Sequence, residues 1–173
     1  MTFTDPFPIV DVMIEPIVSK YLNEDEKLNY DVFPIKVLTQ EPYRTFFEKI
    51  TLEKELFKED FTGLPSSESQ ERRARDFYDI HKLWIYYKKE VPITLADFNH
   101  MLDSRIKHRR NRTKVCFEEF NQYKLLSMFK NKDIRKQLET TDFRKLSIRD
   151  LDCDAIEQSL KEIDEFLIKL LYH

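Results

Sequence analysis

Residues 42–57 read PYRTFFEKITLEKELF, and this stretch decides the fold class. Pro42 stands where proline favours the first turn of a helix. Apolar side chains then recur at the spacing of one helix face, at Tyr43, Phe46, Phe47, Ile50 and Phe57. The polar residues Thr45 and Lys49 lie beside this stripe. The pattern predicts an amphipathic helix that packs through an aromatic face.

The remainder of the chain is also mostly helical in pattern. Further helices are predicted within Ile9–Leu22, from Ser66 or Ser67 to Lys89, from Leu95, over Phe117–Phe129, over Asp133–Leu138 and from Asp154 to Leu171. The segment Tyr30–Leu38 is rich in β-formers, and its Pro34 predicts an edge strand. The expected fold is mainly α: a bundle of about six helices with a small β remnant near the N-terminus. We expect two parts, residues 1–60 with the strand and its flanking helices, and residues 61–173 with the helical bundle.

The composition excludes several classes of protein. Gly63 is the only glycine among 173 residues, where roughly a dozen would be usual. Glycine-rich loops that hold nucleotide phosphates are therefore absent from this sequence. Charged residues make up 35% of the chain, yet the net charge is only -3. This mixture argues against disorder and against a broad nucleic-acid-binding surface.

Cysteine usage and hydropathy bear on the compartment. Cys116 and Cys153 have no metal-type spacing and are expected to be reduced thiols. We expect no membrane span, because no apolar run approaches ~20 residues. The first residues show neither the basic nor the apolar region of a signal peptide. A cytoplasmic location is the expectation.

Two acidic residues on one predicted helix form the first candidate site. Asp76 and Asp79 are separated by about 60° around the helix, so both carboxylates share a face. Such a pair could hold a divalent cation or act as a general base. The alternative is surface ion pairing within the helix, from Arg72 to Asp76 and from Arg75 to Asp79. Spacing alone favours the ion pairs.

The second candidate is Lys49 with its neighbours Arg44 and Thr45. A lysine at the edge of an apolar stripe can extend to a phosphate group. The alternative is an ion pair with Glu53, one turn along the same helix. Spacing alone again favours the ion pair.

Basic and acidic runs give weaker candidates. A basic run that could bind a polyanion comprises Arg105, Lys107, Arg109, Arg110 and Arg112. It lacks aromatic residues, and a solvated helix end is favoured over nucleic-acid binding. The run from Asp150 to Asp154 resembles a metal-binding D-x-D pattern, but acidic residues at a helix start complement the helix dipole. No metal site is predicted there.

Two segments resemble the AbiEii/AbiGii nucleotidyltransferase toxins of bacterial toxin–antitoxin and abortive-infection systems. Residues 37–50, VLTQEPYRTFFEKI, are similar to the family's segment with the pattern vL-x-P-x-R-T-F-x-E-K. Residues 73–83, RARDFYDIHKL, are similar to its segment R-x-R-D-x-Y-D-L. Their order and separation also fit, and the likeness is good from about Pro8 to Leu83.

The resemblance implies roles for residues in both segments. Lys49 would hold the phosphates of a nucleotide, together with Arg44 and Thr45. Asp76, with Asp79 as the other candidate, would complete the catalytic site. The family also has an N-terminal half with a Gly-Ser turn and a D-x-D metal motif, which this sequence lacks. Without those carboxylates there is nothing to hold the cations that phosphoryl-type transfer needs.

We therefore expect this chain to correspond to the C-terminal half of such a toxin. It could be a truncated gene product, the partner of a split gene, or a domain retained for another use. It would be inactive alone and would use Mg²⁺ and a nucleoside triphosphate once an N-terminal half completes it. Whether the chain is an enzyme stays open, and so does the substrate, of which a tRNA is one candidate. Expected partners are a separate N-terminal half, a cognate antitoxin or a second copy. The alternatives are a helical interaction module that binds RNA or protein, and a complete but unusual enzyme.

The predicted strand adds an expectation about association. Without an N-terminal half, Tyr30–Leu38 should be solitary and expose unpaired backbone groups. The chain should then dimerise through roughly its first 60 residues, or bind a separate N-terminal half there.

Overall fold

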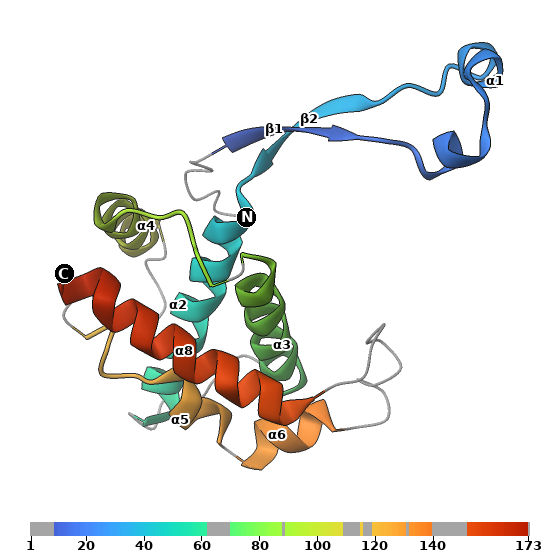
Figure 1. The fold of residues 1–173 in the computed structure, drawn as a ribbon. Coiled ribbons are helices and arrows are strands. Elements are labelled where there is room, and N and C mark those ends of the chain that lie inside the picture. The colour runs from blue at the N-terminus through green and yellow to red at the C-terminus, as the bar shows by residue number, and fades with distance from the viewer. Residues whose placement is uncertain are drawn as a thin grey trace.

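The computed structural model of the chain describes residues 9–61, 70–87, 89–108, 115, 119–130, 132–139 and 152–172. Within these ranges the protein is a helical bundle with one small antiparallel sheet, so the mainly α prediction is confirmed (Figure 1). None of the helices in these ranges combines the length and apolar character needed to cross a membrane.

Helix α2, Pro42–Phe61, is the centre of the bundle and confirms the prediction from residues 42–57. It packs against α3, Gln70–Tyr86, and against the short helix α5. The side chains of Phe46 and Phe47 are fully buried. Phe46 stacks on Trp84 of α3, with ring centroids 6.1 Å apart. The aromatic stripe seen in the sequence thus becomes the contact between the two central helices.

The remaining helices surround this pair. They are α4 (Leu95–His108), α5 (Leu125–Phe129), α6 (Lys132–Leu138) and α8 (Cys153–Tyr172). Helix α8 runs across the bundle and packs on α3 and α5, while α6 packs on α3 (Figure 1). The starts of α4, α6 and α8 lie within one residue of the positions predicted from the apolar periodicity.

The helix predicted over Phe117–Phe129 is wrong in its first part. Residues 119–122 form a turn, and the helix begins only at Leu125. Phe120 and Leu125 are both fully buried. On one continuous helix, positions 120 and 125 would be separated by about 140° around the axis, so the two side chains would point to different sides. The turn allows both to be buried.

The start of α5 is capped from another helix, and this contact can be tested. The carboxylate of Asp164 in α8 accepts hydrogen bonds from the backbone N–H groups of Leu125 and Leu126, at 3.0 and 3.1 Å. We expect Asp164→Ala to lower the free energy of unfolding by about 1–2 kcal/mol, as for other lost helix caps. Glu165→Ala, at the exposed neighbouring position, should change it by less than about 0.5 kcal/mol. Urea denaturation measures both, and equal losses would contradict the capping role.

Residues 9–40, which we call the arm, extend away from the bundle (Figure 1). The arm consists of β1 (Ile9–Ile14), the 3-10 helix η1 (Ile17–Tyr21), helix α1 (Glu24–Asn29) and β2 (Ile35–Gln40). The two strands pair antiparallel, with Val12 opposite Val37. Helix α2, which follows the arm, packs within the bundle on α3 and α5.

The arm corrects two predictions. The first part of the helix predicted within Ile9–Leu22 is strand β1, whereas a short 3-10 helix follows Pro16 at Ile17–Tyr21. The strand predicted at Tyr30–Leu38 lies at Ile35–Gln40 and is not solitary, because β1 supplies its hydrogen-bonding partner. The sequence does alternate apolar residues at Val10, Val12 and Ile14, which is the period of a strand.

Candidate functional site

The two segments that carry the family resemblance meet at one ion-pair cluster. The Nζ atom of Lys49 on α2 lies 3.0 Å from an Oδ atom of Asp79 and also contacts the carboxylate of Asp76, both on α3. Asp76 is buried, whereas the side chain of Asp79 is about half exposed. The packing of α2 on α3 thus brings together three predicted site residues, which we call the Lys49 cluster.

The Lys49 cluster has a defined charge state. Burial by itself would lower the pKa of Lys49, but hydrogen bonds and charge attraction from Asp76 and Asp79 outweigh burial and raise it. The ammonium group is therefore protonated at neutral pH. One positive and two negative groups leave the cluster with a net charge of about -1. The exposed side of Asp79 gives solvent and ligands access to it.

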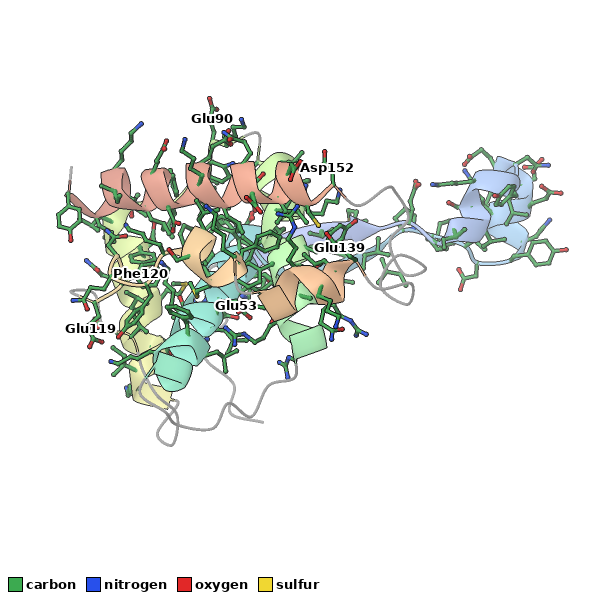
Figure 2. All side chains as sticks on the ribbon, turned by 90° about the horizontal axis from the view of Figure 1, so that it is seen from below. Glu53, Glu90, Glu119, Phe120, Glu139 and Asp152 are labelled. Atoms are coloured by element: carbon green, nitrogen blue, oxygen red, sulfur yellow. The ribbon has the colours of Figure 1, made fainter. Side chains whose placement is uncertain are left out.

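The sequence alternative for Lys49, an ion pair with Glu53, is not what the structure shows. Glu53, labelled in Figure 2, is fully buried and pairs with Arg73 of α3, whose Nε donates to Oε2 at 3.2 Å. Its Oε1 has no hydrogen-bond partner in the described part of the chain. Burial raises the pKa of Glu53 to about 8, although the charge of Arg73 opposes the rise.

Glu53 and Arg73 are the polar residues next to the site that the sequence analysis missed. The sequence does indicate that Glu53 is buried. Phe46, Ile50, Glu53 and Phe57 follow one another at the spacing of one helix face, which is the face that carries the apolar stripe. An ionisable side chain at such a position requires a buried partner. That partner is 20 positions away on another helix, so its identity depended on how the helices pack.

Arg44 and Thr45 have different relations to the cluster. Thr45 precedes Lys49 by four residues and lies on the same side of α2. Arg44 lies about 140° around the helix from Lys49. It is buried, and its Nε donates to Glu48 at 3.0 Å. The structure therefore keeps Thr45 near Lys49 and places Arg44 on another side.

Arg105 has a role other than the predicted polyanion binding. It is buried, and its guanidinium forms a bidentate pair with Glu55, at 3.0 and 2.6 Å. A phosphate backbone cannot reach a group held in this way. Lys107 is exposed, whereas Arg109, Arg110 and Arg112 lie outside the described residues.

The Lys49 cluster does not fit a metal ion. No three His, Cys, Asp or Glu side chains come together to hold one in the described ranges. Between Asp76 and Asp79, the position that a cation would take is filled by the Lys49 ammonium. Near the C-terminus, Asp152 caps α8 by accepting from the N–H groups of Asp154 and Ala155, at 2.9 and 3.1 Å. This contact agrees with the helix-start interpretation of that acidic run; Asp150 lies outside the described residues.

In the Lys49 cluster, the lysine ammonium is held between two carboxylates. Asp76 fixes the ammonium from the buried side, and the exposed Asp79 can exchange with another negatively charged group. No protein-family model, curated protein or solved structure matches this chain.

Proposed function

We propose that this chain is the C-terminal part of a nucleotidyltransferase-like toxin of the AbiEii/AbiGii type, with Lys49 as its nucleotide phosphate-binding residue. One observation carries the proposal: Lys49 of the first similar segment contacts Asp76 and Asp79 of the second. Each segment resembles one pattern of the family, and the packing of α2 on α3 joins the residues to which the resemblance gives a role. Asp76 positions the lysine, and Asp79 is the group that a phosphate displaces.

The energetics of the cluster support exchange with a phosphate. An ion pair with a half-exposed carboxylate contributes about 0–1 kcal/mol, so little is lost when Asp79 releases Lys49. Phosphate oxygens accept charge-assisted hydrogen bonds from a lysine as carboxylate oxygens do, so the bond to Asp79 can be replaced by one of the same kind. The hydroxyl of Thr45, on the same side of α2, can donate a further hydrogen bond. Asp76 keeps the ammonium at the surface between α2 and α3 throughout.

Catalysis in this proposal needs a second polypeptide part. The resemblance implies that the metal-binding carboxylates come from a half with a Gly-Ser turn and a D-x-D motif. That half and the present chain would bind Mg²⁺ and the nucleoside triphosphate jointly. The present residues contribute phosphate binding and the orientation of Lys49. The chain by itself is then expected to bind a nucleotide without transferring its nucleotidyl group.

The test is nucleotide binding by matched lysine variants. Calorimetric titration with ATP, GTP, CTP and UTP should detect binding of at least one nucleotide, and Lys49→Ala should weaken it tenfold or more, as expected for a lost charged hydrogen bond of roughly 1.5–3 kcal/mol. Lys58→Ala is the control, because Lys58 is also on α2 and also pairs with a carboxylate, that of Glu119, at 2.7 Å. Its affinity should stay within about twofold of the wild type.

Two results would contradict the proposal. The first is no binding of any of the four nucleotides at millimolar concentration. The second is an equal loss of affinity in Lys49→Ala and Lys58→Ala, which would indicate nonspecific attraction.

The alternative function, a non-enzymatic interaction module, is favoured by a different feature, the exposed arm.

A further inference from the structure

The two faces of the arm's ribbon differ in their chemistry. Because alternate residues of a strand share a face, the pairing register defines both sets. One set, which we call the aliphatic face, consists of Val10, Val12, Ile14, Ile35, Val37 and Thr39. The other face carries charges, including an ion pair between Asp11 and Lys36 at 2.7 Å. The aliphatic face has no charged residue and only β-branched ones.

The aliphatic face is partly covered within the described part of the chain, where Val10, Val37 and Thr39 are half-buried and the other three residues are exposed. Val12, Ile14 and Ile35 are 40%, 49% and 62% exposed. Figures 1 and 2 both show the ribbon running away from the bundle. Of the sixteen large exposed hydrophobic residues in the described ranges, eleven lie between Val12 and Leu38. A two-stranded hairpin is marginally stable in water unless its apolar face packs on a second layer.

We propose that the arm is a dimerisation element, whose aliphatic face packs on the same face of a second copy of this chain. A two-fold contact requires a self-complementary surface. An uncharged β-branched face meets this requirement, because it pairs with itself at the ~10 Å spacing of packed sheets without burying a charge. The proposal does not depend on the proposed nucleotide-binding function.

The exposed area is large enough for a stable dimer. At the outer end of the arm, Tyr21, Tyr30 and Phe33 are 81%, 71% and 46% exposed. At about 200 Å² for each ring, these three side chains present roughly 400 Å², half of the ~800 Å² that each partner gives to a standard interface. The aliphatic face, with the exposed Ile17, Val18 and Leu28, adds the remainder.

Charge determines the orientation of the two copies. Residues 9–40 contain six acidic and three basic side chains, and three of the acidic ones, Glu24, Asp25 and Glu26, are consecutive at the outer end. A parallel arrangement would bring these two acidic ends together. An antiparallel arrangement separates them by the length of the arm and is therefore the one we expect.

Two neighbouring residues on opposite faces of β1 allow a matched test. Sedimentation of the wild-type chain should show a monomer–dimer equilibrium. Val12→Glu, in the centre of the aliphatic face, should raise the dimer dissociation constant roughly a hundredfold or more, since it buries a charge without a partner. Met13→Glu, on the opposite face, should change the constant by less than about threefold. Circular dichroism should show the same helix content in all three proteins, because the arm extends away from the helical bundle (Figure 1).

Hydrogen exchange provides a second measurement. The amides of β1 and β2 should become more protected as the protein concentration rises, and Val12→Glu should abolish this dependence. A wild-type chain that stays monomeric at about 1 mM, where even a micromolar interface is saturated, would overturn the proposal. Equal weakening by the two variants, or a dimer indifferent to both, would also overturn it.

Discussion

Replacing Arg105 by alanine is expected to lower the free energy of unfolding by about 3–5 kcal/mol. The guanidinium of Arg105 on α4 forms a bidentate pair with Glu55 on α2, and both side chains are buried. The variant removes the group that neutralises the Glu55 carboxylate inside the bundle. Desolvation of this carboxylate is then no longer offset by its bidentate partner. Urea denaturation followed by circular dichroism measures the loss.

Arg135→Ala is the control for the Arg105 variant. Arg135 pairs with Asp154, Glu157 and Glu139, but its side chain is 42% exposed. Water screens these pairs, so the loss of Arg135 should lower stability far less than the loss of Arg105 does. The double variant Glu55→Leu/Arg105→Met should recover most of the stability, because a buried ion pair can be replaced by apolar groups. Comparable losses in Arg105→Ala and Arg135→Ala would contradict this account.

The bundle could be predicted from the sequence because its helices bury continuous apolar stripes. In α8 the buried residues recur at helical spacing along the helix, and in α2 the apolar residues Phe46, Phe47, Ile50 and Phe57 do so. Over that length a helical period is distinct from a strand period. Capping residues in the sequence also predicted where helices begin. At the beginning of α4, for example, the hydroxyl of Thr94 accepts a hydrogen bond from the backbone N–H of Asp97. Each of these signals lies within one helix.

The arm could be predicted only in part, because its strands are short. Six residues of β1 match both a helix face and a strand alternation, and the decision between them depends on a partner strand 26 positions further on, from Ile9 to Ile35. Helix α1 was missed although its signal is local. Asn23 and Glu26 form a capping box there, each side chain accepting from the other's backbone N–H.

The residues of the site could be predicted where they depend on a single helix, but not where they depend on how helices pack. Lys49 and the pair Asp76 and Asp79 were identified as polar flanks of neighbouring helices, and the packing joins them. The buried pairs were not found: Glu53 with Arg73, and Glu55 with Arg105. Their members lie 20 and 50 positions apart, and only the packing of three helices determines which charges meet.

Two adjacent buried residues of α2 should make stability depend on pH in an unusual way. Burial raises the pKa of Glu53 to about 8 and lowers the pKa of Lys54 to about 8. Lys54 is held by the backbone carbonyl of Tyr123 and lies over the ring of Phe120, 4.7 Å from its centroid. Near pH 8, therefore, each side chain is about half charged in the folded chain: as pH rises, Glu53 gains its charge and Lys54 loses its charge.

The two groups affect stability with opposite signs. Between about pH 4.5 and pH 8 the folded chain keeps the Glu53 proton that the unfolded chain has released, so stability falls as pH rises. Between about pH 8 and pH 10.5 the unfolded chain holds the Lys54 proton that the folded chain has released, so stability rises with pH. Each slope approaches about 1.4 kcal/mol per pH unit. Together they predict a minimum of stability near pH 8.

Variants at the two positions separate these contributions. The free energy of unfolding of the wild type minus that of Glu53→Gln should fall by a few kcal/mol from pH 5 to pH 8 and then level off. The same difference taken with Lys54→Met should be nearly constant below pH 8 and should rise by a comparable amount towards pH 10.5. Urea denaturation across this range supplies both curves, and the subtraction removes titrating groups that the variants share. If both difference curves were flat, Glu53 and Lys54 would titrate alike in the folded and unfolded chains, and their burial would have no effect on protonation.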